Sequence, residues 1–262
     1  PINDLALLRG YGIFDFFRLS EGVPLFMENH LDRFYEGAQR VRLPVPVQRE
    51  PLKSLLLEMF RENHMPISGI RMILTGGTGN GAFAIGHPNL IVTQEPISFP
   101  TQQMYREGVK LITYEHLRDI PEVKTINYMT GIWLQNRVRE QGAFDVVYTH
   151  NGCVHELTRS NLFIVTENNE IITPTEQVLK GVTRRQIIEE ASSKWTVQER
   201  SCTMDELRTA REVFITGTTK RVLPISAVDH YTYHSANEGS VTRELMKLFG
   251  QIEQHYIGTN RF

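Results

Sequence analysis

The chain has few cysteines and no long hydrophobic run. Cys153 and Cys202 are isolated in sequence and lack metal-site spacing, which predicts reduced thiols rather than a disulfide framework. The nine histidines include no HExxH motif, and we expect no metal centre. No apolar stretch is long enough to span a bilayer and no signal peptide is visible, so we expect no membrane association and a cytoplasmic location.

An excess of charge of either sign is also missing. The formal net charge of the 262 residues is −2, so the composition provides no electrostatic footprint for nucleic acid. Apolar residues make up 40% of the chain and charged residues 22%, which is typical of a globular protein with a sizeable core. This length predicts one large or two modest domains.

Hydrophobic periodicity predicts a small α+β domain over residues 1–95. Residues 12–27 have the pattern of two strands around a tight turn, and residues 28–42 and 49–63 have the apolar spacing of amphipathic helices. A proline-bounded stretch follows, and we take residues 96–102 as the linker.

The remaining residues, 103–262, predict a larger domain of many short strands and a few helices. Asn151-Gly152 is a hairpin turn signal, and Thr203 with Glu206 has the spacing of a helix capping box. Regular βαβ alternation is absent, which excludes a Rossmann fold and favours an α+β architecture.

Several polar residues suggest chemistry. Lys124 stands between an acidic, proline-containing loop and a stretch of helical character, although a lone lysine is usually solvated. Glu156 lies on an apolar strand, where a buried carboxylate must meet a cation or a donor. Backbone N–H groups at 217–219 suit a phosphate or carboxylate, or form only a turn. The glycine loop at 76–81 lacks the lysine of a P-loop and predicts a hairpin turn.

Motifs across nearly the whole chain resemble, in order and spacing, those of the fold-type IV pyridoxal-phosphate enzymes. That family includes branched-chain aminotransferases, D-amino acid transaminases and aminodeoxychorismate lyases. The motifs are "RGYGIFDFFRL", "MENHLDRF", "VKTINY", "HELTRSNLFIV", "ITP", "LKGVTRR" and "ITGTTKRVLPI". The resemblance implies a small α/β domain, a larger domain with a mixed, barrel-like sheet, pyridoxal 5′-phosphate as cofactor, and a homodimer whose partner subunit completes the pocket.

The resemblance also implies residue roles. Lys124 would bind the cofactor covalently and carry a proton to and from the substrate, and Glu156 would pair with the protonated pyridine nitrogen. Arg33 would bind the phosphate, unless it is an ordinary solvated helix arginine. Other implied cofactor contacts are Tyr128, Leu179, Gly181, Val182, Thr183 and Thr218. Core packing is the alternative role for Tyr128 and Leu179.

The substrate motifs depart from those of the best-known members. Phe14 replaces the tyrosine of well-known D-amino acid transaminases, and the glycine loop lacks their Arg-x-His. Gly69-Ile70-Arg71 stands where branched-chain enzymes usually have Tyr-x-Arg. Arginines near the expected pocket favour an anionic substrate or a firmly held α-carboxylate. The implied substrate site comprises Arg9, Phe14, Arg71, Arg159 and Thr219.

We therefore expect transamination between a D-amino acid, D-glutamate or D-alanine, and a 2-oxo acid such as 2-oxoglutarate. The first alternative is an L-branched-chain aminotransferase, which Phe14 and Arg71 support. An aminodeoxychorismate lyase and a non-catalytic cofactor-binding protein are further alternatives. Arg9 and Arg159 could also serve only in structural ion pairs. In a homodimer, Arg9 is the candidate to reach the partner's pocket.

Overall fold

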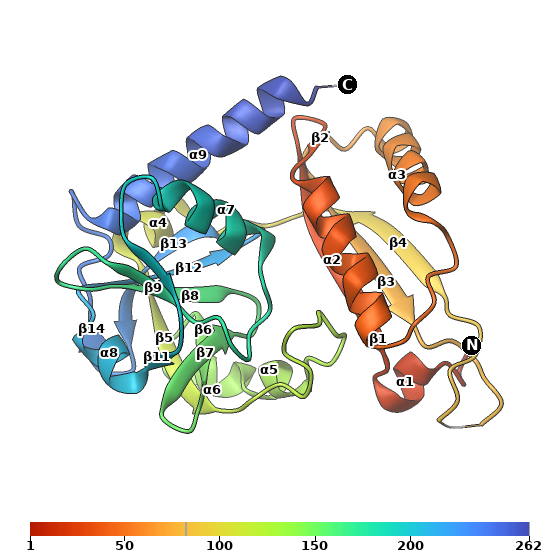
Figure 1. Cartoon of the computed structure of the whole chain (residues 1–262), viewed down its shortest axis with the longest axis horizontal. Coiled ribbons are helices and arrows are strands. Elements are labelled where there is room, and N and C mark those ends of the chain that lie inside the picture. The colour runs from red at the N-terminus through yellow and green to blue at the C-terminus, as the bar shows by residue number, and fades with distance from the viewer. Residues whose placement is uncertain (82, 262) are drawn as a thin grey trace. The chain divides into compact units, whose positions relative to one another are not determined.

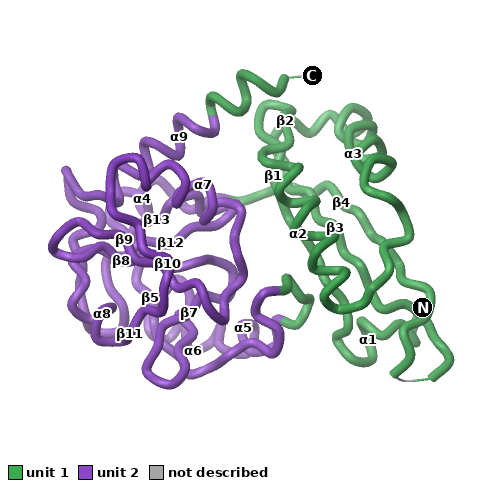
Figure 2. Tube along the Cα trace, viewed as in Figure 1, with its two compact units in different colours: residues 1–98, 123–127, 254–262 green, residues 99–122, 128–253 purple. Residues whose placement is uncertain are grey.

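A computed structural model describes residues 1–81 and 83–261, and the chain divides into two compact units (Figure 2). Unit 1 comprises Pro1–Ser98, Val123–Asn127 and Gln254–Phe262; unit 2 comprises Phe99–Glu122 and Tyr128–Glu253. The sequence predicts contiguous domains, whereas unit 1 includes two short segments from later in the chain. The segment around Lys124 groups with unit 1 because Phe14 N–H donates to its carbonyl at 2.9 Å.

Unit 1 is an antiparallel sheet with helices packed on it (Figure 1). The strand order is β2-β1-β3-β4. The strands are β1 (Gly12–Ser20), β2 (Val23–Pro24), β3 (Ser68–Thr75) and β4 (Leu90–Glu95), and the helices are α1 (Leu5–Arg9), α2 (Met27–Arg40) and α3 (Arg49–Asn63). The two helices expected from periodicity in this region are confirmed as α2 and α3.

Successive side chains of β1 point alternately to a core face and to an open face of the sheet. Ile13 and Phe17 pack in the core with Leu31 of α2, whereas Phe14 and Phe16 point to the opposite side and are half-buried. The core face therefore binds the helices, and the open face carries Phe14 of the expected substrate site.

The short helix α1 was not expected, because five residues are too few for a periodic signal. The side chain of Asp4 caps it by accepting the N–H of Ala6 at 2.8 Å. The helix ends at Gly10, whose φ of 66° favours glycine.

Unit 2 is built on a ten-stranded mixed sheet, most of which closes on itself. Strands pair in the order β8-β12-β13-β5-β6-β7, and β7 also pairs with β8 to complete a ring. The ring strands are β5 (Val109–Glu115), β6 (Asp145–His150), β7 (Cys153–Leu157), β8 (Asn161–Val165), β12 (Glu212–Gly217) and β13 (Arg221–Val228). This arrangement confirms the expected barrel-like, mixed sheet.

The other elements of unit 2 extend or cover the ring. The added strands are β9 (Ile171–Thr173), β10 (Val197–Glu199), β11 (Cys202–Thr203) and β14 (Tyr231–Thr232). The helices are α4 (Gln102–Glu107), α5 (Met129–Trp133), α6 (Gln135–Glu140), α7 (Val182–Ala191), α8 (Met204–Thr209) and α9 (Val241–Thr259), of which α9 continues into unit 1. In the described residues, no helix is both long and apolar enough to cross a membrane.

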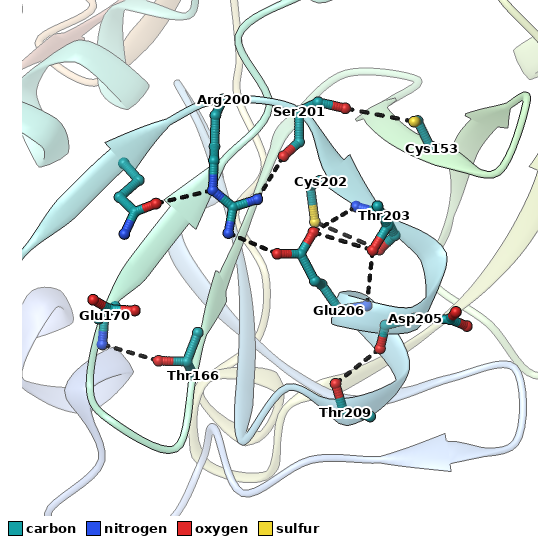
Figure 3. Close-up of polar contacts among 11 residues, drawn as sticks. Cys153, Thr166, Glu170, Arg200, Ser201, Cys202, Thr203, Asp205, Glu206 and Thr209 are labelled. Carbon is teal, nitrogen blue, oxygen red and sulfur yellow. Dashed lines mark hydrogen bonds and ion pairs between the residues drawn. The ribbon is translucent and has the colours of Figure 1, made fainter.

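Two local predictions in unit 2 are confirmed. Asn151 and Gly152 have φ values of 49° and 74°, as the tight hairpin turn between β6 and β7 requires. Thr203 and Glu206 form a reciprocal capping box at the start of α8 (Figure 3). Arg200 is hydrogen-bonded to Glu206 and, with the Thr203 donors, lowers the pKa of that carboxyl to about 2 although burial opposes this.

The two cysteines lie near each other but face opposite sides of the sheet. Cys202 pairs with Val154 and is buried in the barrel core, whereas Cys153 is opposite Thr203 (Figure 3). Neighbouring positions of a strand ladder point to opposite faces, so these thiols are not oriented for a disulfide. Burial raises the pKa of the Cys202 thiol to about 12.

Candidate active site

Lys124 lies against the open face of the sheet in unit 1. Its backbone is held beside β1 by the Phe14 N–H bond and by a bridge between Ile13 and Thr125, and the buried side chain of Val123 anchors the segment in the core. The Lys124 ammonium lies 4.4 Å from the centre of the Phe14 ring. The structure thus brings together the lysine and the aromatic residue that the sequence predicted for the site.

Arg33, the expected phosphate ligand, is bound to a buried carboxylate in unit 1. Its Nε is 2.8 Å from Oδ2 of Asp15, and its Nη2 is 2.8 Å from Oδ1. His30, one helical turn earlier on α2, places Nδ1 2.7 Å from the same Oδ1. The sequence reasoning missed Asp15 and His30, although an acidic residue at a core-facing position of a strand is a recognisable signal.

Arg71 and Arg9, two expected substrate ligands, have different surroundings. Arg71 extends from β3 over the rings of Phe16 and Phe14, at 5.1 and 5.8 Å from their centres, and forms an ion pair with Glu95 of β4. Arg71 is therefore on the same face as Phe14. Arg9 is exposed and has its guanidinium 5.1 Å from the ring centre of Phe83.

In unit 2, Glu156 is a buried carboxylate with donors at both oxygens. Arg118 contacts Oε1 through Nε at 2.7 Å and Nη2 at 2.6 Å, and the Leu179 N–H donates to Oε2 at 2.9 Å. The expectation that Glu156 must meet a cation or a donor is confirmed. Arg118 was missed, because nothing in its loop sequence pairs it with a residue 38 positions away.

The segment 179–183 forms a helix N-terminus suited to an anion. Asn161 donates its side-chain amide to the Leu179 carbonyl at 2.7 Å, and a Cβ added to Gly181 would stand 2.2 Å from Asn161 Oδ1. Gly181 is the N-cap of α7 and provides no side-chain cap, and Val182 and Thr183 open the helix. Such an N-terminus presents backbone N–H groups and the positive end of the helix dipole.

The turn between β12 and β13 adjoins the loop that follows Glu156. A Cβ on Gly217 would lie 3.3 Å from the carbonyl of Arg159, so Thr218 and Thr219 sit beside this loop. The Arg159 side chain is exposed and makes no ion pair with any carboxylate among the described residues. Tyr128 is half-buried and occupies the N-cap position of α5.

Lys220 is the last residue of this turn and was missed by the sequence reasoning. Its side chain is 7% exposed, and burial, reinforced by the charge of Arg159, lowers the pKa of its amine to about 8 while Asp145 opposes the shift. A lysine after two threonines gives no sequence signal of burial.

Comparisons with known proteins show the family of this chain. Residues 12–228 match the family model described as amino-transferase class IV. A Methanocaldococcus jannaschii protein, named provisionally as a branched-chain-amino-acid aminotransferase, is 30% identical over 96% of this chain and 90% of its own length. A D-alanine aminotransferase from Bacillus licheniformis is 27% identical over 93% and 88% of the respective chains.

A solved structure has the same fold. It is a branched-chain amino acid aminotransferase from T.th. with pyridoxamine 5′-phosphate, which superposes with a TM-score of 0.88 at 25% identity, covering 98% of this chain and 91% of the other. The chain belongs to the class IV aminotransferases, and the expected fold type and enzyme class are confirmed. Its cofactor is pyridoxal 5′-phosphate.

The residues present fit this cofactor. The uncapped N-terminus of α7, with a glycine that leaves no room for a side chain, suits its phosphate. The buried carboxylate of Glu156 would suit its ring nitrogen, and the amine of Lys124 would suit its aldehyde. When bound, pyridoxal 5′-phosphate supplies an aldehyde that joins amines covalently and a ring that withdraws electrons from the substrate Cα.

Proposed function

We propose that Lys124 is the catalytic lysine, which holds the cofactor and transfers the proton at the substrate Cα. Glu156 keeps the ring nitrogen protonated, and its contacts with Arg118 and Leu179 keep the carboxylate in one orientation. Phosphate contacts come from Arg33, the α7 N-terminus at 181–183 and the hydroxyl of Thr218. Leu179 packs on the ring, and Tyr128 lies beside the lysine and phosphate.

The substrate pair that we propose is a D-amino acid, D-glutamate or D-alanine, with a 2-oxo acid such as 2-oxoglutarate. The observation that carries this proposal is the exposed Arg159 side chain, which has no carboxylate partner among the described residues, on a residue whose backbone carbonyl adjoins the turn that holds Thr219. A guanidinium with two parallel donors is well suited to a substrate carboxylate. The likeness to a D-alanine aminotransferase supports the same substrate class.

A second candidate, L-branched-chain transamination, is favoured by the open face of unit 1. Glu95 neutralises Arg71 there, and the neighbouring Phe14 and Phe16 are apolar, so this face suits an aliphatic side chain better than a second carboxylate. The likeness to the Methanocaldococcus jannaschii protein also supports this candidate.

A half-reaction screen distinguishes the two candidates. The full chain loaded with pyridoxal 5′-phosphate is mixed separately with D-alanine, D-glutamate, L-leucine and L-glutamate, and the visible absorbance of the cofactor is followed. The proposal predicts that the D-amino acids convert the cofactor; conversion by L-leucine alone would replace it with the branched-chain function.

The role of Arg159 is tested in the same assay. The Arg159→Ala substitution removes a charge-assisted hydrogen bond of about 1.5–3 kcal/mol. It should therefore weaken the binding of D-glutamate about tenfold to a hundredfold. Arg208→Ala is the matched control, because Arg208 is a surface arginine that pairs with Asp205 on α8. If the variant and the parent react equally fast with D-glutamate, Arg159 does not bind the substrate.

We also propose a homodimer. The large side chains of Met129, Ile132 and Trp133 on α5 are 77%, 71% and 67% exposed. Three neighbouring exposed apolar side chains are typical of an interaction surface. Arg9, which is exposed at the end of α1, is the residue that we propose to reach the partner's pocket.

A further inference from the structure

We propose that Asp15 and His30 are positioning residues that fix the guanidinium of Arg33 for the cofactor phosphate. This inference rests on the proposed role of Arg33. Asp15 and His30 hold Arg33 in place from the buried side. This increases the preference of the site for the phosphorylated over the unphosphorylated cofactor.

The contacts with Asp15 define the orientation of Arg33. Asp15 receives two parallel bonds from Nε and Nη2, both 2.8 Å long. A planar guanidinium held by two bonds to one carboxylate has a fixed plane, and the direction of its remaining N–H bonds is fixed with it. A free arginine side chain would instead lose several rotamers when the phosphate binds, which would weaken binding.

The carboxylate itself is held from three sides. Its Oδ1 accepts a bond from the Phe16 N–H at 2.7 Å and lies 2.7 Å from Nδ1 of His30. Asp15 is fully buried on the helix-facing side of β1. Burial opposes ionisation, but the charge of Arg33 and the hydrogen bonds from Arg33 and His30 hold the pKa of Asp15 well below its usual range. The support is therefore a permanently ionised and immobile anion.

His30 has one tautomer that fits these contacts. Burial lowers its pKa, an effect that Asp15 opposes and that Arg33 and Lys124 reinforce, so the ring is neutral near pH 7. A neutral ring must carry its proton on Nδ1 to donate to Asp15, because an unprotonated nitrogen would repel the carboxylate. His30 thereby fixes Asp15 without adding a second charge beside Arg33.

A purely structural ion pair would stabilise the fold but would not distinguish two forms of the cofactor. The discriminating measurement is the ratio of the dissociation constants of pyridoxal and pyridoxal 5′-phosphate, measured by absorbance titration of the cofactor-free full chain. Asp15→Asn retains the shape of the side chain and removes its charge, and His30→Gln retains a donor. Asp32→Asn, next to Arg33 on α2 and paired with Arg49 at the surface, is the matched control.

We expect Asp15→Asn to lower this ratio about tenfold, the loss of one charge-assisted contact, and His30→Gln to lower it less. In an Arg33→Ala background the Asp15 substitution should have no further effect on the ratio, because the two residues act through one group. Asp32→Asn should leave the ratio unchanged.

Two results would overturn the inference while leaving the role of Arg33 intact. One is an Asp15→Asn variant with the parent ratio; the other is an equal effect of Asp15→Asn with and without Arg33. If Arg33→Ala itself does not change the ratio, the proposed phosphate role of Arg33 fails, and the inference fails with it. Circular dichroism and thermal unfolding of each variant show whether the measured chain is folded.

Discussion

Arg118 and Glu156 form a buried ion pair in unit 2, in which Nη2 lies 2.6 Å from Oε1. The pair connects the loop before Lys124 to strand β7, and the Leu179 N–H fixes the second carboxylate oxygen. Because each oxygen accepts from a donor on a different segment, the carboxylate cannot rotate without losing a hydrogen bond. The geometry is that of an anion held in one orientation, which suits a cationic ring nitrogen.

Replacing Glu156 with Gln should retain cofactor binding and slow transamination. The neutral amide cannot stabilise a protonated ring nitrogen as an ion pair, and it also leaves Arg118 without its buried counter-charge. We expect kcat to fall by at least about tenfold, the equivalent of one charge-assisted contact. Steady-state kinetics and the bound-cofactor absorbance test this.

Glu238→Gln is the control for that substitution, because Glu238 is an exposed glutamate of the same unit. It should behave as the parent does. A Glu156→Gln enzyme with parental kcat would show that another carboxylate pairs with the ring.

The burial of Lys220 should make the free energy of unfolding depend on pH. Its folded pKa of about 8 is below the unfolded value of 10.5, so the unfolded chain binds more protons between these pH values. The cost of burying the charge is fully present below pH 8 and disappears as pH rises towards 10.5. Lys220→Met should therefore raise the free energy of unfolding at pH 7 by up to about 3 kcal/mol, with a smaller gain at pH 10.

Urea unfolding of the parent and the variant at both pH values measures this difference. Lys247→Met, at an exposed position of α9, is the control and should show no such gain. A Lys220→Met protein that is less stable than the parent at pH 7 would mean that the buried ammonium is stabilised by contacts other than those described.

If α5 lies in the interface of the proposed dimer, a charge introduced on this helix should separate the subunits. Ile132→Glu places a carboxylate in the exposed apolar patch of Met129, Ile132 and Trp133, where an interface would bury it unpaired. We expect analytical ultracentrifugation to show a dimer for the parent and monomers for the variant. Leu55→Glu, at another exposed apolar position, should leave the dimer intact. A parent that is monomeric throughout would contradict the proposal.

The sequence predicted those features that depend on local chemistry. Helices α2 and α3 follow from apolar periodicity, and the Asn151-Gly152 turn and the Thr203 capping box follow from positions that favour those residue types. The resemblance of the motifs predicted the fold type and cofactor, which the family match confirms.

The features that the sequence did not predict depend on long-range pairing. The ion pairs of Arg118 with Glu156 and of Arg33 with Asp15 join residues 38 and 18 positions apart, and no local pattern specifies such partners. The burial of Lys220 is similarly decided by strand pairing in the barrel. Nor did the sequence indicate that Arg71 is neutralised by Glu95.

In the proposed site, Lys124 is the residue that binds the cofactor. The most direct measurement is to reduce the cofactor-loaded full chain with borohydride, digest it and locate the pyridoxyl group by mass spectrometry. We expect a single modified peptide containing Lys124, and no modification of that peptide in Lys124→Ala. A pyridoxyl group on Lys220 or another lysine, with Lys124 unmodified, would show that Lys124 is not the residue that binds the cofactor.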